Sequence, residues 1–205
     1  MAARIHVAGT RTFAAEVIDY ATDAGLEVIG LLEPREREKV STTVHERPVS
    51  WLDDGPTTED RLVVVGTGEN DRRGTVERLQ SAGWEVSELV HPSAQVAPST
   101  TTGSGTLIAP GAVIGARSRV GDHVVVGRGS LIGHHTEVGP FATLGPGSNV
   151  AGNVRMGEDV FVGMGAVVRD HVEVGAGAVI AMGAVVVRDV GAGTQVRGIP
   201  ATAAG

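Results

Sequence analysis

Residues 132–149 read IGHHTE-VGPFAT-LGPGSN, three groups of six residues that follow one pattern. The same hexad recurs without an insertion from residue 96 to residue 191, sixteen times in all. Its first residue is aliphatic in every case except Thr102, and its second is Gly or Ala except at Arg169 and Val187. Its fifth residue is never larger than Val. One large and one small inward position in every six residues predict short strands that turn a corner once per hexad.

Three such hexads make one coil of 18 residues, so the stretch holds a little over five coils, stacked about 4.8 Å apart like neighbouring strands of a sheet. A coiled coil is excluded because the period is six, and collagen is excluded because Gly occupies no strict third position. A helix is excluded because its period would scatter positions i and i+6 around its surface. The pattern therefore predicts a parallel β-helix, shaped as a triangular prism, with a core of stacked aliphatic side chains.

The composition limits the classes of protein to consider. A chain of 205 residues has room for two small domains. The absence of Cys excludes a disulfide framework and fits a reducing compartment, so we expect a cytoplasmic protein. No apolar run approaches ~18 residues and no signal-peptide segment is recognisable, which argues against membrane spanning and secretion. The net charge of −7, with scattered basic residues and 3% aromatics, argues against nucleic acid as a partner.

The first 90 residues alternate strand and helix signals around a polar connection over residues 34–60, which carries one short strand near Val49. The opening is a βαβ unit with a parallel pair of strands. We therefore predict an α/β, Rossmann-like domain over residues 1–90 and a β-helix domain over residues 91–205, from which residues 196–201 leave as a C-terminal tail. The other predicted elements are strands at 4–8, 26–32, 61–65 and 84–90 and helices at 13–24 and 71–82.

One edge of this N-terminal domain gathers polar residues that follow the predicted strands. Nucleotides often bind at such an edge, so we expect it to hold one, with contacts from Gly9, Thr10, Arg11, Glu33 and Asn70. NAD is not supported, because the turn reads G-T-R-T-F-A where a dinucleotide fingerprint needs G-x-G-x-x-G. The guanidinium of Arg11 is a candidate phosphate ligand.

Chemistry on the β-helix is expected at His134 and His135. Thr136 takes the inward small position of their hexad, which leaves both imidazoles at the corner, directed outward. Gly152 lies one coil above His134 and leaves room beside it. A neutral His suits proton abstraction near pH 7, as when an amine or hydroxyl attacks a thioester, and the Gly152 N–H could face the thioester oxygen.

Two other interpretations of these histidines stay open: solvated corner residues, or metal ligands. Metal binding is the weaker one, because His135 and His171 are two coils apart, roughly 9.6 Å, unless subunits share the site. His123 is expected to be a solvated corner residue. Met164 and Met182 form one corner column, which either packs against a neighbouring subunit or lines a flexible apolar ligand arm.

The chain resembles the hexapeptide-repeat sugar acyltransferases, similar to sialic acid O-acetyltransferases and the bacillosamine-pathway N-acetyltransferase. The resemblance rests on A-E-V-I-D at residues 15–19, V-V-G-T-G-E-N-D-R-R at 64–73, H-P-S-A at 91–94, G-H-H-T-E-V-G at 133–139 and R-G-I-P-A at 197–201. It implies a left-handed β-helix, a homotrimer, acetyl-CoA in the groove between adjacent prisms, and a nucleotide-linked amino sugar on the N-terminal domain.

The resemblance also implies roles for individual residues. His134 matches the catalytic His, Gly152 matches the Gly whose N–H meets the acetyl carbonyl, and Met164 and Met182 fall where backbone contacts the pantetheine arm. Three positions depart from the family pattern. His135 stands where the family has an acid that orients the catalytic His, Thr143 replaces a second His, and the Gly-rich first turn is reduced to Gly9.

The expected function is transfer of an acetyl group from acetyl-CoA to the amine of a nucleotide-linked amino sugar, by direct attack with His134 as base. Three alternatives remain: O-acetylation of a sugar hydroxyl, a zinc hydrase like the trimeric β-helix carbonic anhydrases, and a sugar-nucleotide-binding protein without catalysis.

Overall fold

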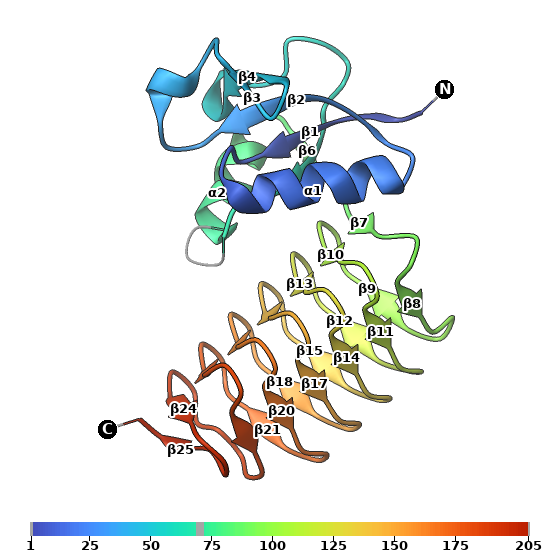
Figure 1. The fold of residues 1–205 in the computed structure, drawn as a ribbon, viewed down its shortest axis with the longest axis vertical. Helices are drawn as coiled ribbons and strands as arrows, with labels where there is room; N and C mark the ends of the chain where they lie inside the picture. Colours follow the sequence, from blue (N-terminus) through green and yellow to red (C-terminus); the bar gives the residue numbers. More distant parts are fainter. Residues whose placement is uncertain (1, 69–71, 205) are drawn as a thin grey trace. The chain divides into compact units, whose positions relative to one another are not determined.

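The computed structural model describes residues 2–68 and 72–204. The chain divides into two compact units between Leu89 and Val90. Figure 1 shows a mixed α/β arrangement in the first unit and a stack of coils in the second. No helix in the described ranges is long and apolar enough to cross a membrane.

The first unit is built on a six-stranded sheet with the order β3-β4-β2-β1-β5-β6. All neighbouring pairs are parallel except the β3–β4 hairpin. Its elements are β1 (Arg4–Ala8), α1 (Thr12–Asp23), β2 (Glu27–Glu33), the 3-10 turn η1 (Arg37–Lys39), β3 (Thr43–Val44), β4 (Arg47–Trp51), the 3-10 turn η2 (Leu52–Asp54), β5 (Leu62–Val65), α2 (Arg72–Ser81) and β6 (Glu85–Val86).

The predicted βαβ opening is present, but a Rossmann-like domain is not evident, because few helices accompany the sheet. Between β2 and β5 the chain forms a hairpin and two short 3-10 turns instead of a helix. Pro34, Pro48, Gly55 and Pro56 occupy this connection, and Pro and Gly oppose helix formation. The predicted strand at 84–90 is in fact two short strands, β6 and β7 (Leu89–Val90).

Burial of the His6 imidazole in β1 has a consequence for stability. The ring packs edge-on against Trp84, with centroids 4.8 Å apart. Burial lowers the pKa of His6 below its ordinary value, although Asp60 and a hydrogen bond with the backbone of Leu62 act in the opposite direction. The unfolded chain therefore binds a proton more readily than the folded chain near pH 6.5.

We accordingly expect the free energy of unfolding to fall as the pH is lowered through about 6.5, because His6 must stay neutral in the fold. The measurement is urea unfolding at several pH values for the wild type and for His6→Gln. The variant should show a weaker decrease over that interval. An identical pH dependence in both proteins would contradict this assignment.

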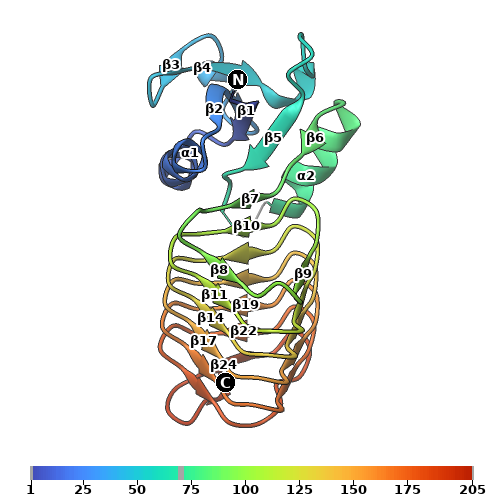
Figure 2. The ribbon, with the colours of Figure 1, turned by 90° about the vertical axis from the view of Figure 1, so that its right-hand side faces the viewer.

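The second unit is a parallel β-solenoid with three strands per coil. Up to the last coil, each strand pairs in register with the strand 18 residues later, as in the pairs Leu107–Val125, Val113–Leu131 and Arg119–Glu137, which confirms the predicted coil length. The strands form three sheets, here called the first face (β7-β10-β13-β16-β19-β22-β24-β25), the second face (β8-β11-β14-β17-β20-β23) and the third face (β9-β12-β15-β18-β21). Figure 2 shows the coils stacked one on another.

Most strands of the solenoid contain only two residues, the sixth of one hexad and the first of the next. Their bounds are β8 (Gln95–Val96), β9 (Thr101–Thr102), β10 (Leu107–Ile108), β11 (Val113–Ile114), β12 (Arg119–Val120), β13 (Val125–Val126), β14 (Leu131–Ile132), β15 (Glu137–Val138), β16 (Thr143–Leu144), β17 (Asn149–Val150), β18 (Arg155–Met156), β19 (Phe161–Val162), β20 (Val167–Val168), β21 (Glu173–Val174), β22 (Val179–Ile180), β23 (Val185–Val186), β24 (Gln195–Arg197) and β25 (Thr202–Ala203).

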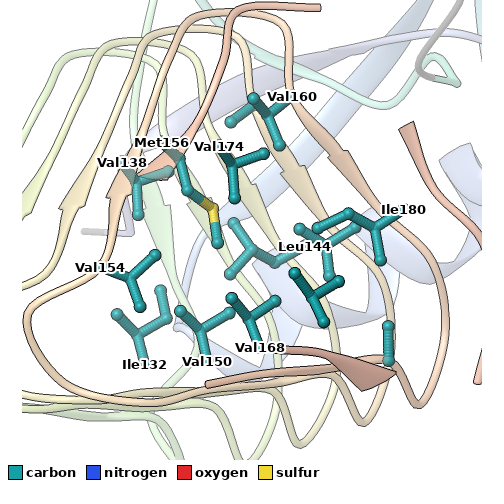
Figure 3. Packing of buried hydrophobic residues seen from close by; sticks show 14 of the residues in the cluster. Ile132, Val138, Leu144, Val150, Val154, Met156, Val160, Val168, Val174 and Ile180 are labelled. Carbon is teal, nitrogen blue, oxygen red and sulfur yellow. The ribbon is translucent and has the colours of Figure 1, made fainter. Parts of the chain in front are cut away.

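The core consists of the predicted columns of aliphatic side chains. In Figure 3, Met156 lies with Val138 and Val174, and Ile132 lies with Val150 and Val168. Most hydroxyls at the small fifth position are also buried and donate to a backbone carbonyl of the next coil, whereas the Ser148 hydroxyl donates to the Ser130 hydroxyl. The Thr136 hydroxyl, for example, donates to the Ala151 carbonyl at 3.0 Å. This pairing explains how Ser and Thr alternate with Ala and Val there without leaving a buried polar group unsatisfied.

In the fourteen hexads that begin at residues 102 to 180, the fourth residue turns the corner with a positive φ. The angle is 56° at His135, 59° at Asn153 and 66° at Gly147. Side chains at the third and fourth positions consequently leave the prism. The corner between the second and third faces carries His134, and we call it the His corner. The corner between the first and second faces carries Met164 and Met182, and we call it the Met corner.

The last coil is shorter than the sequence pattern indicates. Val190 bridges Val174 and Val196 pairs with Ile180, both 16 residues apart instead of 18. The sixteenth hexad therefore has only four residues, and a new hexad begins at Val190. The prediction that residues 196–201 leave the prism was wrong for its first part, because Val196 is buried in the core and β24 continues the first face.

Candidate functional site

The two adjacent histidines at the His corner form a hydrogen-bonded pair. Their Nδ1 atoms are 3.0 Å apart, and their rings lie nearly perpendicular, at 88°, with centroids separated by 5.2 Å. Both residues are exposed. The positive φ at His135 swings its side chain back toward that of its neighbour, so the corner geometry itself brings the rings together. One imidazole of the pair must donate through Nδ1 and the other must accept.

Gly152 lies in the next coil, directly against the imidazole of His134. The backbone of that coil is in register, because the Asn153 N–H donates to the His134 carbonyl at 2.9 Å. A Cβ on Gly152 would lie 2.9 to 3.1 Å from three atoms of the His134 ring, closer than most Cβ atoms approach a neighbour. The missing side chain thus provides the space in which the ring lies. Within the described residues the Gly152 N–H has no hydrogen-bond partner, as is general for third positions of the hexads.

The Met corner is a separate site within one chain. Met164 and Met182 lie one coil apart, with side chains 52% and 72% exposed. Both the Met corner and the His corner border the second face, whose outward side chains are mostly apolar. Leu131 and Val167 on this face are each 41% exposed. The structure therefore does not bring the methionines to His134, but it places both at the edges of one apolar surface.

In the first unit, four of the predicted contacts line one pocket at the carboxyl ends of β1 and β2. The pocket includes Gly9, Thr10, Arg11 and Glu33, and encloses about 380 Å³ of space including its open mouth. Asn70 lies outside the described residues. Pocket-lining residues that the sequence did not indicate are Phe13, Pro34, Arg35, Gly66, Thr67 and Gly68. The last three directly follow the predicted strand at 61–65. The pairing of that strand with the strand at 4–8 sets Gly66 beside Gly9.

Glu33 is a buried acidic residue that lines this pocket. Its carboxylate is buried and accepts hydrogen bonds from the Thr10 hydroxyl and from the N–H groups of Arg35, at 2.7 Å, and Glu36, at 3.0 Å. Arg11 is exposed and forms an ion pair with Glu36. Hydrogen bonds from Lys39 and then Arg11 lower the pKa of Glu36. Arg11 and Arg35 line the pocket and bring positive charge to it that suits a phosphate group.

The expectation about another corner residue, His123, was wrong. His123 is buried rather than solvated, because it packs against Phe141 of the next coil with ring centroids 4.9 Å apart. In the shortened last coil, Asp189 lies beside Glu173 and accepts a hydrogen bond from the Glu173 N–H at 2.9 Å. Across residues 2–68 and 72–204, no group of three or more His, Cys, Asp or Glu side chains is placed to hold a metal ion.

Comparison with known proteins places the chain in a family. The model of the bacterial transferase hexapeptide (six repeats) matches residues 99–134 and 153–188. PerB from Caulobacter crescentus, solved in complex with CoA and GDP-perosamine, is 30% identical over 98% of this chain and 97% of its own, with a TM-score of 0.90. The chain belongs to the hexapeptide-repeat sugar acyltransferases. Membership makes it an acyl-CoA-dependent enzyme, as predicted, with acetyl-CoA as co-substrate.

Another solved acetyltransferase is similar over nearly the whole chain. The acetyltransferase domain of PglB from Neisseria gonorrhoeae is 28% identical over 98% of this chain and 100% of its own, with a TM-score of 0.89, and was also solved with acetyl coenzyme A. A variant of the perosamine N-acetyltransferase with one His replaced by Asn was solved with CoA and GDP-perosamine. None of the curated proteins compared by sequence matches the chain.

Proposed function

We propose that this sugar acyltransferase acetylates the amine of a nucleotide-linked amino sugar. The observation that carries the proposal is the similarity, over nearly the full length of both chains, to an enzyme solved with CoA and GDP-perosamine. The pocket of the first unit supports it, since a buried acceptor in a pocket lined by Arg11 and Arg35 suits the nucleoside diphosphate of such a substrate.

In the proposed reaction His134 is the general base. The amine nitrogen attacks the thioester carbonyl carbon, the carbon–sulfur bond breaks, and His134 takes the proton that the nitrogen loses. CoA leaves as the thiolate and takes up that proton from His134, which regenerates the base. The Gly152 N–H donates to the carbonyl oxygen as negative charge develops there. The exposed His134 ring and the unpaired Gly152 N–H support these roles, and no covalent intermediate on the protein is required.

The proposed assembly is a homotrimer of left-handed β-helices located in the cytoplasm. The second face supports self-association, because a regular sheet with exposed Leu131 and Val167 is suited to burial against another copy. Acetyl-CoA would then lie between two prisms, with Met164 and Met182 of one prism along its pantetheine arm. Light scattering at micromolar concentration tests the trimer.

The direct test is an assay with acetyl-CoA and a panel of GDP-, UDP- and dTDP-linked amino sugars, each paired with the corresponding hydroxyl sugar. Acetylation of an amino sugar, detected by mass spectrometry, is the expected outcome. If only the hydroxyl sugars were acetylated, the proposal would be wrong and the enzyme would be a sugar O-acetyltransferase. Thermal shift ranks the panel first, because a ligand at 100 times its Kd adds about 2.7 kcal/mol of stability.

Gly68 offers a test of the nucleotide pocket. It lines the pocket, and a Cβ added there would meet no other atom within 4 Å, so Gly68→Leu fills space without straining the fold. We expect the KM for the nucleotide-linked sugar to rise about tenfold or more, because a clash with the ligand costs at least ~1.4 kcal/mol. The Kd for CoA, measured by calorimetry, should not change. An unchanged KM would show that the nucleotide does not bind in this pocket.

A further inference from the structure

The Nδ1–Nδ1 contact between His134 and His135 restricts where the protons of the pair reside. A neutral imidazole carries one N–H and one lone pair, on different nitrogens. If His134 donates through Nδ1, its Nε2 keeps a lone pair and is available as a base. If His135 donates instead, His134 carries its proton on Nε2 and has no lone pair left for the substrate. Only the first arrangement supports proton abstraction at Nε2.

We propose that His135 is the positioning residue of His134, a neutral imidazole whose Nδ1 accepts the His134 Nδ1–H and thereby fixes the productive tautomer. The proposal rests on the assignment of His134 as base. It follows that catalysis needs both imidazoles uncharged. Protonated His135 has donors at both nitrogens, so its Nδ1 no longer accepts and the productive hydrogen bond is lost.

Two further contacts hold the pair in place. The His134 ring lies against Gly152, in a space that no other residue type leaves open. The backbone of His135 is fixed by its N–H, which donates to the Ala116 carbonyl at 2.9 Å, and by its positive φ. The His134 ring is thus bounded by the next coil and by its partner, and rotation of either ring breaks the 3.0 Å contact.

The corner residues directly above and below the pair are uncharged except for Arg117, below His135. Ala116 in the coil below, and Gly152 and Asn153 in the coil above, carry no charge. The charged and titratable groups on the same corner are Arg117, one coil below His135, then Arg169, Asp170 and His171, two coils above the pair, and Arg188 and Asp189, one coil further on. On the third face, the nearby Glu137 is paired with Arg119. Within the described residues, no carboxylate contacts either ring, so His135 itself supplies the acceptor.

Two substitutions separate the roles of His135 without straining the corner. Equivalent fourth positions hold Asn153 with a φ of 59° and Gly147 with a φ of 66°, so His135→Asn and His135→Gly suit the backbone. The Asn variant keeps an acceptor oxygen but cannot titrate. The Gly variant removes the acceptor. His171→Asn, at the same hexad position two coils away, is the matched control.

The first experiment needs no substrate. Two-bond proton–nitrogen spectra of protein labelled with ¹⁵N-histidine report the tautomer of each imidazole, and the His134 signal is the one lost in His134→Asn. We expect His134 to be protonated on Nδ1 and bare at Nε2 at neutral pH, and to lose this preference in His135→Gly but not in His171→Asn. A His134 protonated on Nε2 in the wild type would overturn the proposal.

The second experiment is the pH profile of kcat/KM for acetyl transfer. The wild type should lose activity on the acidic side with a slope one proton steeper than His135→Asn, since only the wild type must keep a second imidazole neutral. The substrate amine contributes equally to both and cancels in the comparison. His135→Gly should lower kcat about tenfold or more, less than the loss at His134. Equal slopes and equal rates in all three proteins would contradict the proposal, whereas a wild type inactive on every amino sugar would contradict the proposed function alone.

Discussion

His134→Asn is expected to lower kcat by about 10² to 10⁴, the range contributed by a general base. Asn keeps a polar side chain of similar reach but has no basic nitrogen, so the amine must lose its proton without help. Binding of CoA should be nearly unchanged, because the pantetheine arm is assigned to the Met corner and His134 only to the reacting atoms. The measurement is kcat from initial rates, with the Kd for CoA from calorimetry.

Gly152→Ala is the companion variant for this prediction. Its Cβ would lie 2.9 Å from the His134 ring and must push the imidazole aside, while leaving both histidines in the sequence. Activity should therefore fall although the base is still present. His171→Asn serves as the control on the same corner. A His134→Asn enzyme within about threefold of the wild type on its best acceptor would rule out His134 as the base.

Met156→Ala is expected to reduce the free energy of unfolding by about 2 to 5 kcal/mol, the usual cost of truncating a buried side chain of this size. Met156 is 5% exposed and lies between Val138 and Val174, one coil on either side (Figure 3). In a solenoid each coil is stabilised by its two neighbours, so the cavity weakens both interfaces at once. Denaturant unfolding measures the change.

Arg155→Ala is the control for this truncation. Arg155 is the adjacent residue of β18, points outward with a side chain 70% exposed, and pairs with Glu173 at 3.4 Å. An exposed pair of this kind contributes about 0 to 1 kcal/mol, so the loss should be small. Similar losses of unfolding free energy in the Arg155 and Met156 variants would contradict the assignment of Arg155 to the surface and Met156 to the core.

The hexad pattern predicted the solenoid well because each position in it has one environment. Column residues such as Leu144 and Ile180 are buried where the pattern placed them. The pattern failed at its end because Val suits both the first and the fifth positions. Val190 was assigned to the fifth position, but it occupies the first position of a shortened coil. Nothing in the identity of the residue distinguishes the two.

Prediction was less complete for side chains whose surroundings come from another coil or strand. His123 is buried by Phe141, a contact 18 residues away that a hexad-by-hexad view does not include. Thr10 and Glu33 were predicted at the same edge of the sheet. The hydrogen bond between them, and those that the carboxylate accepts from backbone N–H groups, were not predicted. The arrangement of His134 against His135 likewise depends on the positive φ of the corner, which the sequence does not state.

The positive φ at the fourth hexad position limits which functional groups the corners can display. Of the seven non-glycine residues that hold it in the solenoid, five are His, Asn or Asp, the types that tolerate this conformation best: His123, His135, Asn153, Asp159 and His171. Every coil offers the same conformation again, about 4.8 Å further along the axis. A His, Asn or Asp side chain introduced at a fourth position by a single substitution is therefore displayed in the same orientation as in the other coils, at a spacing of about 4.8 Å along the axis.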